Sequence, residues 1–557
     1  MNISGTPEKL ISITRLGCQT VLTAEFFCPL PHSVMPWLAF LNLFSYLCIQ
    51  KKSSTAMKII SYHNFTFPFQ WCINGKDQDS FPEQTDLNSI DYAQNTNWQR
   101  VDNNSPCSET DGNVLYDERN YFYQFIHNAL YDNGGANSLI HHFERLEPQL
   151  ATQGRQKKVV YRIDTEGKSY ELTVGAINLN LYTTGVGILS FYLYNDRYPD
   201  EEDVLRINQK GRRIFPPYIG SVDDRKVIAD CISIEGLHGK TGLYSEDFTS
   251  YKNTTGNNEP ARFVKDMIFE IAQNIHINPV VDDRMFVACW YKNDNWANAF
   301  SGNGCEEFIQ GDRWFEFVSV DELYQKSCRN HDMQKELIGK ATYRRWQEDG
   351  TLCGITRNSM MCATRSDSPD HYLNTFETIY ARMAELILVQ RASVLRFSAE
   401  ITNINSNPDD HDFSHKVQTL YKEYIRFVNQ IHFTEVTAQT PGIELYWRLF
   451  NSMNLGRQVD KLDNELQELY NYVTLQEESN TNKTMNTLTW IATFLLPITV
   501  VAGIFGMNNQ ALNGEGDGTT NNWYNHFGWQ FIIIAFAIVL GICILRYLQS
   551  KNKKNSF

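Results

Sequence analysis

Two long stretches near the C-terminus contain no charged residue, and they limit the fold of this chain more than any other feature. Residues 488–505 and residues 529–545 each lack Asp, Glu, Lys and Arg. A helix needs roughly 17–25 mostly apolar residues to cross a membrane, and two such runs close together are rare in soluble domains. Pro497 would break a helix in water, but neighbouring helices in a membrane bundle can satisfy the freed backbone group. We therefore expect a two-helix transmembrane domain at residues 486–548 rather than two buried helices of a soluble core.

The charges around these runs predict their orientation. Lys483 precedes the first run and four basic residues follow the second, whereas the connecting loop 509–528 has two acids and no basic residue. Cytoplasmic flanks of membrane helices are enriched in Lys and Arg. Both termini are therefore expected in the cytoplasm, with residues 549–557 as a basic cytosolic tail. The protein is expected in the cell membrane, which it would cross twice.

The overall charge and the motifs argue against several functions. A formal net charge of −14 opposes nonspecific binding to nucleic acid, which rewards Lys and Arg, and it is compatible with binding cations. A mean hydropathy of −0.39 confines any membrane part to a small fraction of the chain. We find no phosphate-binding loop, nucleophile elbow or catalytic triad in the sequence, so we expect neither an enzyme nor a catalytic residue.

The cysteines and histidines form no recognisable metal site. The twelve cysteines are scattered, and no pair has the Cys-x-x-Cys spacing of a zinc or redox site. Cys353 and Cys362 are the closest pair in the sequence, but a reduced compartment with ordinary buried thiols is the favoured interpretation. His141 and His142 lack ligand spacing and are expected on the surface.

Residues 1–57 are expected to be a poorly defined N-terminal extension. Residues 26–50 carry no charge, but three prolines interrupt them, and the part after Pro36 is short for a membrane span. A secretory signal is disfavoured because no small-residue cleavage pattern follows.

Residues 58–365 are predicted to form a cytosolic α/β domain, because clusters of β-branched and aromatic residues alternate with helical patterns. The expected helices lie near residues 121–130 and 259–275. The expected strands cover residues 159–163, 170–174, 176–182, 187–194, 285–291, 314–320 and the region 354–363. The fold class is therefore α+β, with this mixed α/β domain, a long stalk helix and two C-terminal transmembrane helices.

Residues 366–485 are predicted to be helical and to include a stalk. Helices are expected from about residue 369 to 403 and over 414–432. Thr440 caps a third helix, with Pro441 at its first position, and no proline follows until Pro497. We expect one continuous helix from Pro441 to Gly506, about 100 Å long, rather than two helices joined near residues 478–482.

A repeat of apolar residues within this helix predicts a coiled coil. The residues are four and three positions apart in alternation, as in heptads. They are Leu455, Val459, Leu462, Leu466, Leu469 and Val473. We expect this seam to pack between subunits.

The first uncharged run ends in the tripeptide Gly506, Met507 and Asn508. The tripeptide alone is a weak signal, but here it closes the first of two C-terminal spans, after a predicted stalk and with Pro497 in place. In this context residues 482–508 resemble the first membrane helix of the CorA magnesium transporter family. The resemblance extends over most of the chain from about residue 160 onward.

This resemblance implies a homopentameric channel for Mg²⁺, with Co²⁺ and Ni²⁺ as further candidate ions. Gly506, Met507 and Asn508 would form its selectivity filter, and Asn508 would contact the metal. Mg²⁺ gives up its water reluctantly, so a wide mouth of neutral oxygen acceptors suits it. Carbonyls at a helix C-terminus and the Asn508 amide would supply these acceptors, and Gly506 would let the chain turn. The alternative for Asn508 is a simple helix cap.

Six residues before the filter are expected to line the pore or gate, because their spacing lets them face one axis. They are Asn482, Met485, Leu488, Leu496, Thr499 and Gly503. The three large apolar side chains would form a constriction that gates by dewetting, and the Asn and Thr residues would form polar rings. The alternative, common for apolar residues in a span, is packing against lipid or another helix.

The sequence departs from the family pattern at two places. Phe505 stands where the family usually has Tyr, and the loop 509–528 is longer than the short bacterial type. The preferred function is still an Mg²⁺ channel whose partners are divalent ions, the lipid bilayer and copies of itself. Mg²⁺ would also regulate it by bridging carboxylates of residues 200–330 between subunits. The alternatives are a Zn²⁺ transporter of the same superfamily and a membrane-tethered signalling or scaffold protein without transport.

Overall fold

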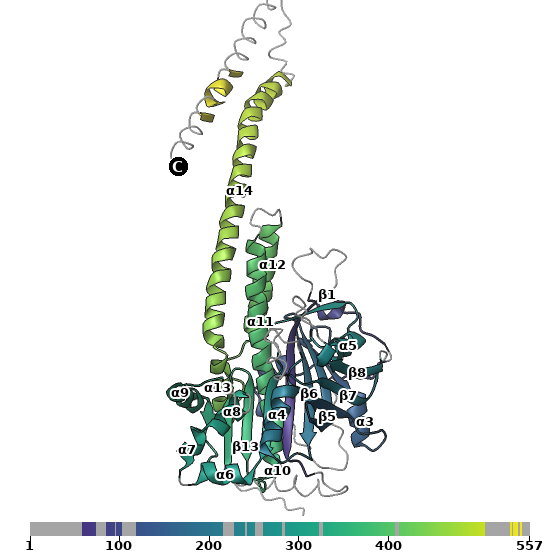
Figure 1. Cartoon of the computed structure of the whole chain (residues 1–557). Coiled ribbons are helices and arrows are strands. Elements are labelled where there is room, and N and C mark those ends of the chain that lie inside the picture. The colour runs from purple at the N-terminus through teal and green to yellow at the C-terminus, as the bar shows by residue number, and fades with distance from the viewer. Residues whose placement is uncertain are drawn as a thin grey trace, which may run out of the picture. The chain divides into compact units, whose positions relative to one another are not determined.

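The structure is a computed structural model, shown in Figure 1, and it describes most of the chain from Lys58 onward. The described residues are 58–73, 85–94, 96–102, 118–214, 228–239, 242–250, 260–280, 284–302, 304–321, 327–406, 412–506, 535–536, 538–543 and 546–547. The expected extension 1–57, the loop 509–528, the tail 549–557 and most of the second uncharged run lie outside them.

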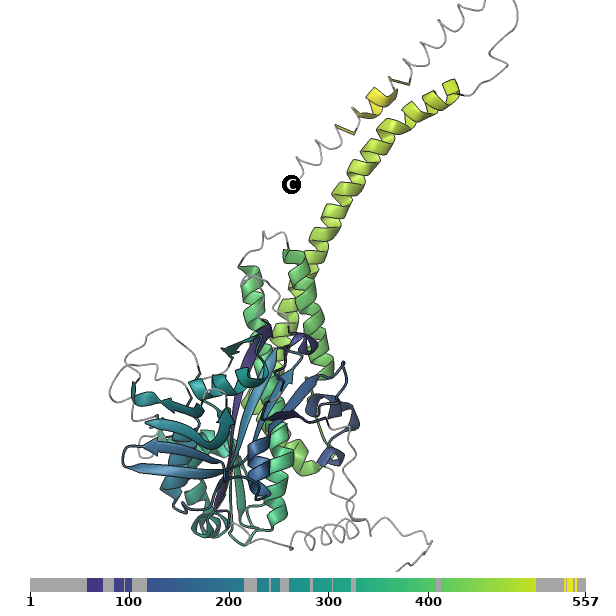
Figure 2. The ribbon, with the colours of Figure 1, turned by 90° about the vertical axis from the view of Figure 1, so that its right-hand side faces the viewer.

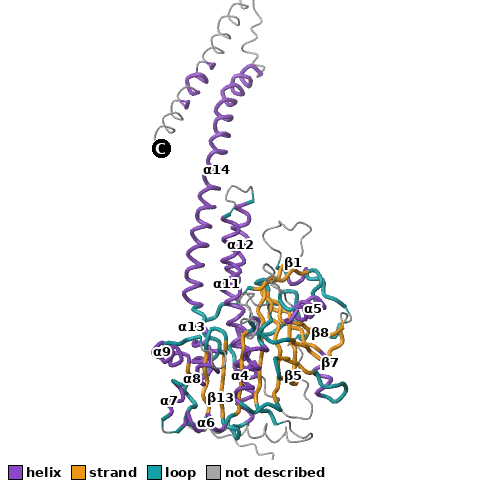
Figure 3. The backbone as a smooth tube through the Cα atoms, in the orientation of Figure 1, coloured by secondary structure: helices purple, strands orange, loops and turns teal. Residues whose placement is uncertain are grey.

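One large mixed sheet forms the centre of the α/β domain (Figure 3). Its strands are β1 (Ser61–Ile73), β2 (Trp98–Arg100), β3 (Ile140–Arg145), β4 (Val160–Thr165), β5 (Lys168–Tyr182), β6 (Val186–Asn195), β7 (Cys231–Gly239), β8 (Gly242–Asp247), β9 (Ile275–Pro279), β10 (Phe286–Lys292), β11 (Thr342–Tyr343), β12 (Thr351–Ile355) and β13 (Ser359–Thr364). The order is β11-β12-β13-β10-β1-β6-β5-β4-β7-β8, with β2, β3 and β9 attached to it. Among the described pairs only β10 with β13 is parallel.

The central strand β1 was not predicted, because it lacks the polar alternation of a half-exposed strand. Both of its faces are covered, so nearly all of its residues are buried. Its central proline also argues against a strand, since proline cannot donate to a ladder. Pro68 is tolerated because β10 pairs with β1 only as far as Thr66, and β9 begins to pair at Phe69.

Two other segments differ from the expected strands. Residues 170–174 and 176–182 belong to the single strand β5, which has an irregularity between Val174 and Ala176. Residues 314–320, expected as a strand, mostly form helix α8 (Asp312–Ser319), so that prediction was wrong. A short run of aromatic and β-branched residues fits a buried helix as well as a strand.

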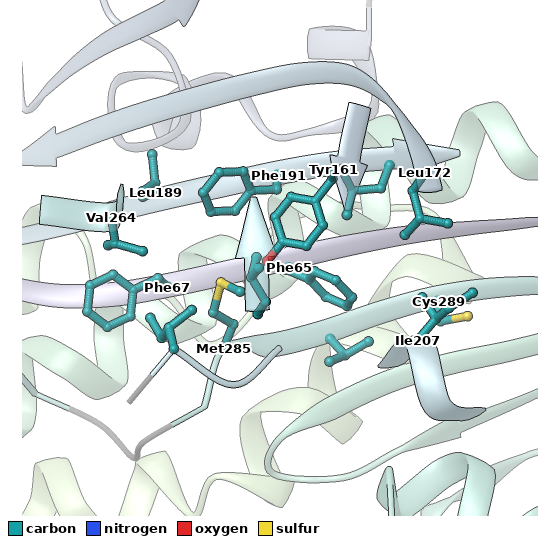
Figure 4. Packing of buried hydrophobic residues seen from close by; sticks show 14 of the residues in the cluster. Phe65, Phe67, Tyr161, Leu172, Leu189, Phe191, Ile207, Val264, Met285 and Cys289 are labelled. Carbon is teal, nitrogen blue, oxygen red and sulfur yellow. The ribbon is translucent and has the colours of Figure 1, made fainter. Parts of the chain in front are cut away.

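Helices cover both faces of the sheet. One face is covered by α4 (Glu201–Gly211), α5 (Arg262–Ile271), α6 (Asp294–Ser301), α7 (Cys305–Ile309), α8 and α9 (His331–Ala341). Figure 4 shows this core, in which Phe65 and Phe67 of β1 lie among Tyr161, Phe191 and Val264.

The C-terminal helices lie on the opposite side (Figure 2). They are α10 (Asp370–Thr375), the π-helical turn η6 (Phe376–Tyr380), α11 (Ala381–Asn405), α12 (Phe413–Gln430), α13 (Thr440–Ser452) and α14 (Leu455–Gly506). Here α11 packs on β1 and β6 and α13 packs on β12, and α12 and α14 pack on α11. Two short helices, α2 (His127–Leu130) and α3 (Leu146–Thr152), complete the described α-helices before α4. The predicted helices at about 369–403 and 414–432 are thus confirmed within a few residues.

The cysteine and histidine predictions need correction. Cys353 and Cys362 form a disulfide, because they are direct register partners across β12 and β13 with Cα atoms 4.1 Å apart. The predicted surface position of His141 and His142 is wrong, since the two side chains are 2% and 3% exposed. The His141 ring lies 2.7 Å from the Tyr92 hydroxyl, so these histidines are satisfied residues of the core.

The stalk consists of two helices rather than one. Helix α13 ends at Ser452, and α14 begins at Leu455 after Asn454, whose φ of 54° is in the left-handed region. Asn is among the few non-glycine residues that adopt this conformation, which commonly ends a helix. The expected continuity from Pro441 is therefore wrong, whereas continuity through residues 478–482 is confirmed. Within the described residues, no helix meets the length and apolarity expected of a membrane span.

The apolar seam of α14 packs inside the chain. Leu455, Leu462, Leu466 and Val473 are at most 1% exposed in a single chain. They share one hydrophobic core with residues of α11 and α12, and Tyr424 of α12 lies beside them. The expectation of a coiled coil between subunits is corrected by this packing, because the seam already has an intrachain partner.

Candidate functional site

The six predicted pore residues all lie on the C-terminal half of α14, beyond the part that packs on α11 and α12. Asn482 is exposed, and Met485, Leu488 and Leu496 are 57%, 56% and 62% exposed. Thr499 is exposed as well. A Cβ atom added at Gly503 would meet no atom within 4 Å. Nothing in the described part of one chain covers this stretch closely, so its apolar side chains are available to a membrane or to other subunits.

The spacing of these residues places them on one face of the helix. At about 100° per residue, the positions from Asn482 to Gly503 fall within an arc of about 120°. Exposure alone does not select this face, because Ile491, Phe494 and Leu495 outside it are 51%, 50% and 50% exposed. The apolar surface of α14 is therefore wider than the predicted pore stripe.

One contact distinguishes the two sides of α14. The guanidinium of Arg546, just after the second uncharged run, lies 5.8 Å from the centre of the Trp490 ring. Trp490 is about 140° around the helix from the middle of the predicted pore stripe. The C-terminal helical segment thus contacts a face of α14 other than the predicted pore face.

The threonines of this half of α14 satisfy their hydroxyl groups within the helix. Thr489 donates to the carbonyl of Met485 at 2.7 Å and Thr493 to that of Thr489 at 2.6 Å. Thr499 donates to the carbonyl of Leu496 at 2.9 Å. A threonine bonded in this way exposes no unsatisfied donor, which makes it compatible with an apolar environment.

The first residue of the predicted filter is also the last described residue of α14. This residue is Gly506, and Met507 and Asn508 lie outside the described residues. The position of the tripeptide at a helix C-terminus and its geometry therefore stay predictions.

The described part of the chain contains no group of three or more His, Cys, Asp or Glu side chains arranged to hold a metal ion. Several carboxylates of residues 200–330, where regulatory ligands were expected, form ion pairs within the chain. Asp203 lies 2.7 Å from the Lys168 ammonium, and Glu201 lies 3.3 Å from Arg313. The hydrogen bond from Arg344 holds the pKa of Glu306 below its ordinary value.

Comparison with protein families places the C-terminal part of the chain. Residues 454–549 match the family model described as CorA-like Mg2+ transporter protein. This segment belongs to the CorA-like family. It contains α14, the six predicted pore residues, the predicted filter and both uncharged runs. A comparison with curated proteins finds no match.

The match over residues 454–549 has coarse consequences. The family consists of Mg²⁺ transporters and thus of membrane proteins, so the match indicates divalent-cation transport. The sequence anticipated this family, but the resemblance was expected from about residue 160 onward and the match begins at residue 454. Sequence reasoning missed the break at Asn454, which no glycine or proline marks, and the contact of Trp490 with Arg546, which joins residues far apart in the sequence.

Proposed function

We propose that this chain is one subunit of a homopentameric Mg²⁺ channel of the cell membrane, with α14 lining the pore and both termini in the cytoplasm. The family match over residues 454–549 carries the proposal, because it spans α14 and both uncharged runs. The uncovered stripe from Asn482 to Gly503 supports it. A single helix cannot enclose a pore, so several copies of α14 must surround one axis.

In this channel Gly506, Met507 and Asn508 form the selectivity filter. Backbone carbonyls and the Asn508 amide present a ring of neutral oxygen acceptors, which suits an ion that keeps much of its water. Full negative charges are not required there, because the acceptors bind the ion through its hydration shell. Asn508 is the residue that we expect to contact the hydrated metal directly.

The stripe on α14 supplies the conduction path and the gate. Met485, Leu488 and Leu496 form apolar rings, from which water is expelled when the pore narrows. Asn482 forms a polar ring before them along α14, and Thr499 forms one after them. Because Thr499 donates its own proton to a backbone carbonyl, its oxygen is left to accept from the water around a passing ion.

Cytosolic Mg²⁺ is proposed as the regulator of this gate. Like charges on neighbouring acidic domains repel, and a divalent ion between them offsets the repulsion and stabilises the closed ring. The chain's net charge of −14 supports this idea. Carboxylates without an intrachain cation are the candidates, since those paired within the chain, such as Asp203, are already neutralised.

Uptake into vesicles that contain the purified full chain tests the proposal. We expect Mg²⁺ entry, with Co²⁺ and Ni²⁺ as weaker substrates, and Asn508→Ala should reduce the rate about tenfold or more. Asn480→Ala is the matched control, because Asn480 is exposed on α14 outside the pore arc. An Asn508→Ala variant that folds and keeps the parental rate would contradict the filter. A preference for Zn²⁺ would favour the zinc-transporting branch, and no uptake of any ion would favour a scaffold.

A further inference from the structure

Glu377 is a partly buried acid, and among the described residues no Lys or Arg forms an ion pair with it. It belongs to η6, a π-helical turn between α10 and α11, which differs from the α-helical backbone on either side. Burial raises the pKa of Glu377 to about 7, and a hydrogen bond with Tyr194 offsets only part of this effect. Its Oε1 atom is buried and has no hydrogen-bond partner among the described residues. π-turns inside helices are frequent at functional positions.

The strands below this turn contribute a row of polar aromatic side chains. Tyr194 of β6, Tyr62 of β1 and Trp290 of β10 are direct register partners across three adjacent strands. The Phe376 ring lies over two of them, 6.2 Å from Tyr62 and 5.4 Å from Trp290. Tyr62 is fully buried and Trp290 is 4% exposed, yet the Tyr62 hydroxyl and the Trp290 indole nitrogen lack partners among the described residues.

A second acid on the same helical segment has a different set of partners. Glu385 lies about two turns after Glu377 and accepts hydrogen bonds from Asn180 and, at 2.8 Å, from the Tyr182 hydroxyl. The positive charge of Arg382 also faces Glu385. Burial favours the protonated form of a carboxyl group, and donors or a cation offset that effect. Glu377 has the hydrogen bond with Tyr194 as its offsetting contact.

The other charged groups around η6 are already engaged. Lys292 of β10 lies 4.0 Å from Asp370 at the start of α10. Arg382 of α11 lies 3.0 Å from Glu118. His371 of α10 is partly buried, and this burial lowers the pKa of its ring and favours the neutral form. The titratable groups that face the Glu377 carboxyl from the sheet are thus the hydroxyls of Tyr194 and Tyr62.

We propose that Glu377, Tyr194 and Tyr62 form a proton-binding site that couples pH to the conformation of the π-helical turn at the start of α11. With the proton bound, the neutral carboxyl is tolerated beneath the turn. When the proton leaves, the carboxylate needs the Tyr62 hydroxyl or entering water as a donor, and the turn must shift to provide it. Because α11 packs against α14, a shift at the start of α11 would be transmitted to the stalk through this contact.

The sign of the effect on stability follows from linkage. Glu377 titrates near 7 in the folded chain and near its ordinary 4.5 when unfolded. Between these values the folded chain binds more protons, so its stability falls as pH rises through this window. Glu377→Gln fixes a neutral side chain and removes this dependence. We therefore compare the melting temperature of the variant with that of the parent at each pH. The difference, variant minus parent, should increase by about 2 °C or more between pH 5 and pH 8.

The experiment is thermal unfolding of the purified full chain across this pH range, together with infrared detection of a protonated carboxyl. The infrared band should be present at pH 6, fade above pH 8 and be absent in Glu377→Gln, while Glu385→Gln retains it. Tyr62→Phe, which keeps the ring but removes the donor, should move the fading to higher pH. Identical pH profiles for parent and Glu377→Gln would overturn the proposal. If that variant does not fold, an unmoved transition in Tyr62→Phe would overturn it instead. Neither readout depends on transport, so the proposed channel is tested separately.

Discussion

At the scale of single residues, Asn454 determines where the stalk begins. Its left-handed backbone ends α13, and the next residue, Leu455, starts α14 fully buried. The amide of Asn454 donates to the carbonyl of Asn451 at 2.9 Å, and its own carbonyl accepts from Gln458 at 3.2 Å. One residue thus closes one helix and opens the next, which sets the angle at which α14 leaves the domain.

This role predicts how substitutions at the junction behave. Asn454→Val places a β-branched side chain in the left-handed region, which should cost about 1–3 kcal/mol of stability. Asn454→Gly should change stability by less than about 1 kcal/mol, because glycine adopts this backbone without strain. Thermal unfolding of the two variants beside the parent measures the difference. Equal stability of the Val and Gly variants would show that the junction is not held in this conformation.

At the scale of elements, α14 has two halves with different tasks. Its first half is held by the intrachain seam against α11 and α12, whereas its second half exposes apolar side chains on several faces. The seam therefore anchors the helix to the domain, and the proposed assembly would use other surfaces.

The seam can be tested with two leucines of the same helix. Leu466 is fully buried and Leu475 is 65% exposed. Leu466→Ala should destabilise the chain by about 2–5 kcal/mol, since it opens a cavity in the core. Leu475→Ala should change stability by less than about 0.5 kcal/mol. Denaturation of both variants, followed by the mass of each assembly, gives the answer. If Leu466→Ala kept the parental stability but formed a smaller assembly, the seam would pack between subunits and not within one chain.

The sequence predicted the helices at 370–405 and 413–430 within a few residues but predicted the partners of their faces poorly. The heptad spacing of Leu455 to Val473 indicated that one face of α14 is buried, but the spacing is the same whether the partner is α11 or another subunit. Strand β1 was not predicted, because its two buried faces and Pro68 remove the usual pattern.

The pore residues were proposed because the Gly506, Met507 and Asn508 motif and its context are local in sequence, and they stay a prediction. The environment of Glu377 could not be predicted, because it depends on strands that lie far away in the chain.

At the scale of the whole molecule, the proposed channel requires that one face of α14 turn toward a common axis. The contact of Arg546 with Trp490 favours the face that contains Met485, because Trp490 lies about 140° from the middle of that face. The side of α14 opposite this contact is the one that the proposed channel would turn toward neighbouring subunits. The contact between Arg546 and Trp490 thus supports one orientation of α14 in the proposed ring.

Paired cysteine substitutions test this orientation in the assembled protein. Met485→Cys should form disulfide-linked dimers under mild oxidation, because copies of this position approach one another around a narrow pore. Trp490→Cys should not, since it faces the chain's own C-terminal segment. The parent chain gives the background from its native cysteines, and a denaturing gel without reductant shows the cross-links. Cross-linking at Trp490→Cys in place of Met485→Cys would mean that the opposite face of α14 lines the pore. Cross-linking at neither position, in an assembly of parental mass, would place α14 away from the axis.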